Sequence, residues 1–222
     1  NVLARHVGID VRVVDIGVAF DFEAVPGLIH KKVMFGTKNL MLESAMSLAQ
    51  AEQALTVGIE LAAEAVQEGI GLIGTGEMGI GNTTTSSAIA AVMTRRPVSE
   101  VTGRGTGIDD VGHAHKIDVI QRALAIHRLD STNAMEVLTK VGGLEIGGLA
   151  GLILGAAAAR IPIVLDGFIA GAAALIAVGL QPRCKDYLIA SHQSVERGHQ
   201  AILDHLGLKP LFDLDLRLGE GT

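Results

Sequence analysis

The sequence predicts an α/β fold, a mainly parallel sheet with helices on both of its faces. Short β-branched runs alternate along the chain with longer segments that have helical periodicity or are rich in Ala and Gly. The 222 residues are 49% hydrophobic but only 3% aromatic, and Trp is absent, so small aliphatic side chains must fill the core. The 28 glycines allow backbones to approach closely. This length suits one domain with a sizeable core.

Five segments are predicted as strands. Four are short runs of β-branched or other apolar residues that end at a turn residue such as Gly, Asp or Ser. The fifth alternates Phe or Leu with Asp or Arg, the period-two pattern of a half-exposed strand or extended arm. In chain order they are Val11–Val14, Gly71–Gly74, Ile161–Leu165, Tyr187–Ala190 and Leu211–Leu218.

Helical spacing of apolar residues fills most of the remaining chain. Leu40–Glu68 is expected to form one helix or two, with Gly58 as the weak point. Asn82–Thr85 offers several N-caps for a helix through Ala88–Met93. Further helices are predicted over Val111–Leu129, Asn133–Val141, Leu144–Arg160 and Ile169–Val178, and after Ser194 as far as Leu206.

Composition excludes several classes of protein. The net charge of −6 argues against a nucleic-acid partner. The longest apolar stretches, Ile146–Ala159 and Gly167–Leu180, are shorter than the roughly 20 residues that a membrane span needs, so we expect buried helices and no membrane attachment. Cys184 is the only cysteine, which excludes an intramolecular disulfide and fits a reducing cytosol.

Glycine-rich and polar residues follow the predicted strands. In parallel α/β sheets, ligands bind at the carboxyl ends of the strands. We therefore expect Asp15–Gly17, Gly74–Gly81, Asp166-Gly167 and Ser191–Ser194 to converge on one edge of the sheet.

The segment from Gly74 to Thr85 has the features of a phosphate site. A strand runs into glycines and then into a helix start, where free N–H groups and the positive helix end favour an anion. A purely structural strand-to-helix turn is the alternative, because the segment lacks the Walker pattern and matches the dinucleotide pattern only weakly. Lys116, after a second glycine-rich loop at Gly103–Gly107, could hold a phosphate or could be a solvated lysine.

Two other patterns suggest different chemistry, and both are weak. His113 and His115 form an H-x-H without further ligands at suitable spacing, so we expect no metal. Ser191, His192 and Asp166 could form a hydrolase triad, but no Gly-x-Ser-x-Gly elbow surrounds a serine.

Glu220, flanked by two glycines and close to Leu218, could serve as a general base or could be a solvated turn residue. Glu77 has the same ambiguity.

Seven motifs in register carry a resemblance. The chain resembles the nicotinate-nucleotide–dimethylbenzimidazole phosphoribosyltransferases over nearly its whole length. The motifs are Gly76–Thr84, Gly103–Gly107, Ala114–Lys116, Gly142–Ile146, Leu165–Phe168, Ser191–Ser194 and Arg217–Thr222.

The resemblance implies a Rossmann-like, three-layer α/β/α fold with a small helical domain. It also implies a cytoplasmic homodimer that uses no metal and no cofactor. Its expected reaction transfers the phosphoribosyl group of nicotinate mononucleotide to 5,6-dimethylbenzimidazole, releasing nicotinate and giving α-ribazole 5′-phosphate for the lower ligand of cobalamin.

Residue by residue, the resemblance matches Glu220 to the catalytic base and Glu77 to a second carboxylate of the site. Leu218 matches one wall of the base pocket. The positions expected around the ribose phosphate are Gly79, Gly105, Lys116 and Ser194.

Residues 1–222 are expected to be a single α/β core domain, a fragment from which the N-terminal and C-terminal helical parts are missing. A non-catalytic nucleotide or phosphate binder and a nucleotide N-glycosidase that uses the same carboxylates remain alternatives. A binder of an anion would have no need of both Glu77 and Glu220.

Overall fold

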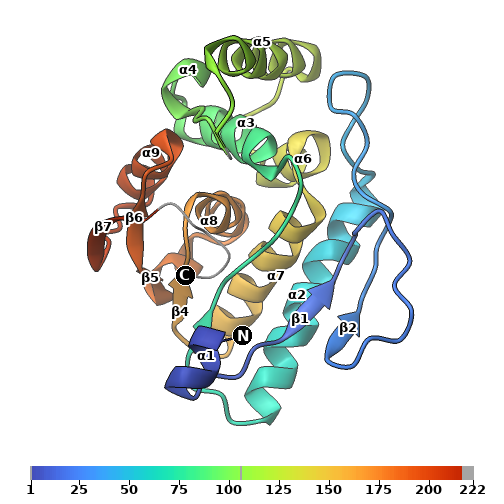
Figure 1. The fold of residues 1–222 in the computed structure, drawn as a ribbon, viewed down its shortest axis with the longest axis vertical. Helices are drawn as coiled ribbons and strands as arrows, with labels where there is room; N and C mark the ends of the chain where they lie inside the picture. Colours follow the sequence, from blue (N-terminus) through green and yellow to red (C-terminus); the bar gives the residue numbers. More distant parts are fainter. Residues whose placement is uncertain (1, 106, 217–222) are drawn as a thin grey trace.

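The protein has the predicted α/β fold with parallel strands (Figure 1). The computed structural model describes residues 2–105 and 107–216. The helices are α1 Val2–Val7, α2 Leu48–Gln67, α3 Asn82–Thr94, α4 Val98–Val101, α5 Asp110–His127, α6 Ala134–Val141, α7 Leu144–Ala158, α8 Phe168–Leu180 and α9 Arg197–Leu206, with a 3-10 helix, η1, over Pro182–Tyr187. The strands are β1 Val13–Asp15, β2 Leu28–His30, β3 Ile73–Gly74, β4 Ile163–Leu165, β5 Leu188–Ala190, β6 His192–Ser194 and β7 Phe212–Leu216.

The central sheet has the order β3-β4-β5, and all its neighbouring strands are parallel. Ile163 of β4 is opposite Ile73 of β3 on one side and Leu188 of β5 on the other. The chain passes from β3 to β4 through α3–α7, and from β4 to β5 through α8 and η1. Two further parallel pairs, β1-β2 and β6-β7, form separate two-stranded sheets. Helix crossovers between parallel strands bring the strands' carboxyl ends to one edge.

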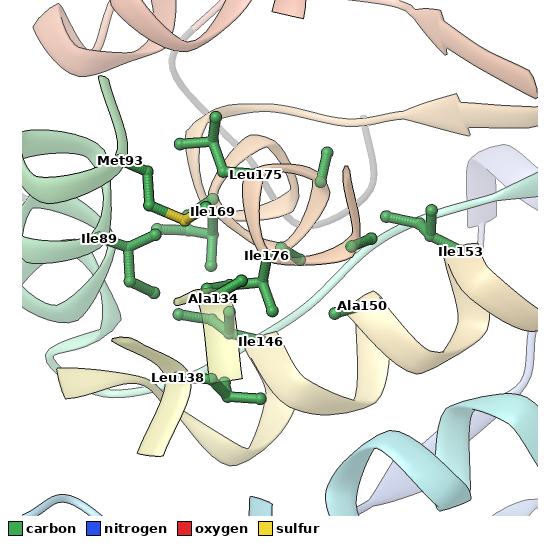
Figure 2. Packing of buried hydrophobic residues seen from close by; sticks show 14 of the residues in the cluster. Ile89, Met93, Ala134, Leu138, Ile146, Ala150, Ile153, Ile169, Leu175 and Ile176 are labelled. Carbon is green, nitrogen blue, oxygen red and sulfur yellow. The ribbon is translucent and has the colours of Figure 1, made fainter. Parts of the chain in front are cut away.

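Helices α3, α6, α7 and α8 enclose the apolar core, in which Ile89, Leu138, Ile146 and Ile176 meet (Figure 2). The two apolar stretches of the sequence form α7 and α8, and α8 is buried along most of its length, as predicted. Within the described part of the chain, no helix is both long enough and apolar enough to cross a membrane.

The long helical pattern begins later than predicted. Residues 40–47 are not helical, and α2 starts after Ser47, whose side chain accepts from the backbone of Gln50 while Gln50 reciprocates. This capping box fixes the helix start. Gly58 is not a weak point, because α2 continues through it and lies along α7 (Figure 1). A Cβ at Gly58 would lie 1.9 Å from the carbonyl oxygen of Gly148, so glycine is what allows the two backbones to touch.

Candidate active site

The carboxyl ends of the three central strands are tied together. Thr75, directly after β3, donates its N–H to the carbonyl of Val164 (2.9 Å), and its hydroxyl accepts from the N–H of Asp166 (3.0 Å). On the other side of β4, the N–H of Ser191 donates to the carbonyl of Leu165 (3.1 Å). These bonds confirm the predicted convergence for three of the four segments that follow strands.

The fourth segment, after β1, is not part of that sheet, so its predicted place is wrong. Asp15 is buried in the β1-β2 unit and forms an ion pair with Lys32 (2.7 Å). Burial alone would raise the pKa of Asp15, but Lys32 and the backbone N–H groups of Val18 and Gly17 outweigh it, and the pKa is lowered. Gly17 nevertheless packs against Leu144, so this segment approaches the N-terminus of α7.

Lys116 joins three segments around the start of α3. From α5, its Nζ donates to Oγ1 of Thr83 (2.8 Å) and to the carbonyl of Gly103 (3.3 Å). Gly105 has a φ of +55°, and a Cβ there would lie 3.1 Å from the Thr83 hydroxyl and 3.7 Å from Nζ. The predicted residues Gly105 and Lys116 are therefore neighbours. A half-buried ammonium beside a helix N-terminus and a glycine loop is a suitable setting for a phosphate.

Glu196 is a carboxylate that the sequence analysis did not single out. Its Oε2 is buried and has no hydrogen-bond partner among residues 2–105 and 107–216, and a Cβ at Gly103 would lie 1.8 Å from it. Burial lowers the pKa of Lys116, while the negative charge of Glu196 acts in the opposite direction. The only sequence clue to Glu196 is its place two residues after the Ser191–Ser194 motif.

Ser194 is held in the same region. Its hydroxyl accepts from the N–H of Glu196 (3.3 Å), and its own N–H donates to Nδ1 of His199 (2.9 Å). His199 is buried on α9, and burial together with the nearby His192 lowers its pKa to about 4. A neutral imidazole therefore orients the Ser194 backbone. The proximity of Ser194 and Lys116 through Glu196 agrees with the predicted nucleotide site, and their roles remain predictions.

Gly79 lies against a second group of polar side chains. The Asn82 amide donates to Oε2 of Glu77 and lies near the carboxylate of Glu145. A Cβ at Gly79 would lie 2.9 Å from Nδ2 of Asn82 and 3.1 Å from Oε1 of Glu145. Burial raises the pKa of Glu145, although Asn82 and its own N–H oppose this shift. Glu145 belongs to the Gly142–Ile146 motif, but nothing in the sequence around it indicated a role for this residue.

The serine-hydrolase alternative finds no support in the geometry. Ser191 donates its only hydroxyl hydrogen to the carbonyl of Leu165 (2.6 Å). In the 2.9 Å contact with Nδ1 of His192, the imidazole must then be the donor, so it cannot act as the base for that serine. The Nε2 of His113 contacts the carbonyl of Thr102 at 2.9 Å. Among the described residues, no group of three or more His, Cys, Asp or Glu is arranged to hold a metal.

Two predicted residues, Glu220 and Leu218, lie outside the described residues. Their roles remain predictions.

The comparison with protein families identifies the chain. The model of the DBI_PRT family, described as phosphoribosyltransferase, matches residues 1–222. The chain belongs to this phosphoribosyltransferase family. A relative from Chloroflexus aggregans, named nicotinate-nucleotide–dimethylbenzimidazole phosphoribosyltransferase, is 61% identical over the whole chain, and one of the same name from Geobacter sulfurreducens is 59% identical.

A solved structure of this family has the same fold. The crystal structure of CobT from Thermus thermophilus superposes with a TM-score of 0.92 at 44% identity, covering 98% of this chain and 65% of that one. The chain spans 63% of the length of the two curated phosphoribosyltransferases.

Proposed function

We propose that the intact protein transfers the phosphoribosyl group of nicotinate mononucleotide to 5,6-dimethylbenzimidazole, giving α-ribazole 5′-phosphate and nicotinate for assembly of the cobalamin lower ligand. The observation that carries this is the match of the whole chain to relatives about 60% identical whose names state these substrates. The geometry adds support, because the Lys116 ammonium contacts Thr83 at the start of α3, and the carboxylates of Glu77 and Glu145 lie beside the same helix start.

The Lys116 group is suited to the 5′-phosphate. Lys116 and Gly105 lie beside the start of α3, and Ser194 lies just before the start of α9. Gly79 allows the loop before α3 to pass close to Asn82 and Glu145. A point charge and backbone donors can bind a phosphate without reading the base. In the proposed reaction this site holds the 5′-phosphate of the nucleotide, and none of its residues bonds to the reacting carbon, C1 of the ribose.

Bond exchange at ribose C1 needs a base more than an acid. The C1–N bond to the pyridinium ring breaks, and its electron pair neutralises the positive ring nitrogen of the departing nicotinate. One benzimidazole nitrogen forms the new bond from the opposite face. The proton on its other nitrogen then passes to Glu220, which relieves the positive charge that builds up on the ring. Glu77 is proposed to steady the ring or the ribose.

Product analysis tests the proposal. The intact protein is incubated with both substrates, and the products are identified by mass spectrometry and by NMR of the anomeric proton. Nicotinate and α-ribazole 5′-phosphate in equal amounts are expected. Ribose 5-phosphate formed without any need for dimethylbenzimidazole would indicate the N-glycosidase, and nucleotide binding without products would indicate the binder. Either result would contradict the proposed transfer.

The resemblance also supports a cytoplasmic homodimer without a metal or cofactor. Light scattering coupled to size-exclusion chromatography of the intact protein measures the oligomeric state, and a monomer at micromolar concentration would contradict the homodimer. Fluorescence microscopy of the tagged protein in its native host tests the proposed location.

A further inference from the structure

Three polar side chains from three separate segments meet beside Gly79. Glu77 lies in the loop after β3, Asn82 is the first residue of α3, and Glu145 is in the first turn of α7. The Asn82 amide donates to Oε2 of Glu77, and the same side chain opposes the rise that burial causes in the pKa of the Glu145 carboxylate. Atoms of both Asn82 and Glu145 would lie within 3.1 Å of a Cβ on Gly79. One amide therefore lies between two carboxylates.

Glu77, Asn82 and Glu145 form a bridge in which one amide lies between two carboxylates, and the chemistry of these groups determines how the amide is oriented. An asparagine amide has two N–H donors on one nitrogen, whereas an ionised carboxylate can only accept. Only one orientation of the Asn82 amide directs its donors toward the carboxylates. Without donors between them, Glu77 and Glu145 would repel each other in a poorly solvated place.

Two glycines make room for the Glu145 end of the bridge. A Cβ at Gly143 would lie 2.8 Å from Oε1 and 2.9 Å from Oε2 of Glu145, and one at Gly79 would lie 3.1 Å from Oε1. Burial raises the pKa of Glu145, and the Asn82 hydrogen bond acts against that shift. Glu145 is therefore held in place from two sides and limits where the Asn82 amide can lie.

We propose that Asn82 and Glu145 are positioning residues that hold the Glu77 carboxylate in the orientation required for phosphoribosyl transfer. This rests on the proposed function, in which Glu77 faces the ring or the ribose. Neither residue needs to touch a substrate. Glu145 fixes the amide of Asn82, and that amide fixes Oε2 of Glu77.

The decisive variant is Asn82→Asp in the intact protein. It keeps the shape of the side chain, removes both donors and adds a like charge to the bridge. Three carboxylates then meet in a poorly solvated place, which outweighs the favourable interaction of one acidic residue with the helix dipole, so the melting temperature should fall, and the folded fraction is measured beside kcat. The Glu77 carboxylate should move, and a misplacement of about 1 Å can cost about 10²-fold in rate. We expect kcat to fall by roughly that factor, and to fall by more than KM for nicotinate mononucleotide rises, because the contacts of Lys116 with Thr83 and Gly103 do not involve the Asn82 side chain.

Asn133→Asp is the matched control. Asn133 caps α6, and its side-chain oxygen accepts from the N–H of Glu136 (3.0 Å). Aspartate keeps that acceptor, so the same chemical change at another helix start should leave kcat near the wild-type value.

The Glu145 pair tests the other end of the bridge. Glu145→Gln keeps a side-chain oxygen that can accept from Asn82 and should retain most of kcat. Glu145→Ala removes it and should lower kcat about as far as Asn82→Asp does. A loss in both variants with equal loss of folded protein would mark Glu145 as purely structural and overturn its positioning role.

Failure of this inference can be separated from failure of the proposed function. If the wild type makes α-ribazole 5′-phosphate and Asn82→Asp does so at the same kcat, the positioning role is wrong and the function stands. If the wild type makes no product, the proposed function is wrong. Crystal structures of the wild type and of Asn82→Asp then test the positioning role without any need for activity. A Glu77 carboxylate that occupies the same place in wild type and Asn82→Asp would overturn it whatever the activity.

Discussion

Replacement of His199 by asparagine should remove a large part of the acid sensitivity of folding. His199 is buried, and its Nδ1 accepts from the N–H of Ser194 at 2.9 Å. Asparagine offers an oxygen near the position of Nδ1 but cannot titrate in this range. The variant therefore preserves the hydrogen bond to Ser194 and removes only the ionisable ring, together with some packing.

The sign and size of the effect follow from the pKa. Burial, helped by His192, lowers the pKa of His199 from 6.5 to about 4. Between these values the unfolded chain binds a proton that the folded protein does not. The contribution of neutral His199 to the free energy of unfolding is therefore fully present above pH 6.5 and is lost progressively as the pH falls toward 4. At 1.36 kcal/mol for each pH unit, the interval amounts to about 3 kcal/mol.

Urea unfolding of the intact protein at a series of pH values from 7 to 4 measures this contribution. The wild type should lose about 3 kcal/mol more free energy of unfolding than His199→Asn over that range. His115 is exposed on α5, so His115→Asn is the control and should follow the wild type. If His199→Asn has the same pH dependence as the wild type, the neutral, buried state of His199 is wrong.

Four further predictions concern the site and the packing behind it. Lys116→Ala should raise KM for nicotinate mononucleotide by an amount equivalent to about 1.5–3 kcal/mol, the cost of a lost charged hydrogen bond, and an unchanged KM would remove Lys116 from the site. Glu220→Gln should lower kcat by about 10²–10⁴-fold with nucleotide binding intact; near-normal turnover would make Glu77 the next candidate for the base. A chelator should leave steady-state activity unchanged, and activity that disappears and then returns with zinc would contradict the expected absence of a catalytic metal. Gly58→Ala should lower the free energy of unfolding by about 1–3 kcal/mol, since its Cβ would collide with α7, whereas Gly71→Ala, with no atom within 4 Å of a Cβ, is the control in the same urea assay.

Local patterns predicted most of the helices and the central strands, because each depends on residues close in sequence. The apolar runs that became α7 and α8 could be placed from their composition alone. Elements that are held mainly by contacts between residues far apart in sequence could not be predicted in this way. Strand β2 spans three residues and exists through its pairing with β1, and α4 is a four-residue helix between loops. The start of α2 was visible in principle, since Ser47 and Gln50 have capping-box spacing.

Of the candidate site, sequence reasoning placed Lys116 and Gly105 together, which the structure confirms, while their phosphate role stays a prediction; it missed Glu196 and Glu145. Neither glutamate stands in a pattern that specifies what it faces. Glu196 reaches Gly103 through the packing of α9 against α3 and α4, and Glu145 reaches Gly79 because the first turn of α7 lies beside the loop before α3. Such contacts between distant segments leave no periodic trace in the sequence.

The sequence alone does not show which groups approach the glycines of the two glycine-rich loops. A loop glycine indicates that something approaches the backbone too closely for a Cβ, and a phosphate was the natural expectation. At Gly103 and Gly79 the nearest groups include the carboxylates of Glu196 and Glu145. A site that bound only an anion would gain nothing from carboxylates packed so close to its loops. In the proposed reaction the carboxylate near the ring or the ribose is Glu77, which accepts from the Asn82 amide at the start of α3, so the carboxylates behind these loops fit phosphoribosyl transfer better than simple phosphate binding.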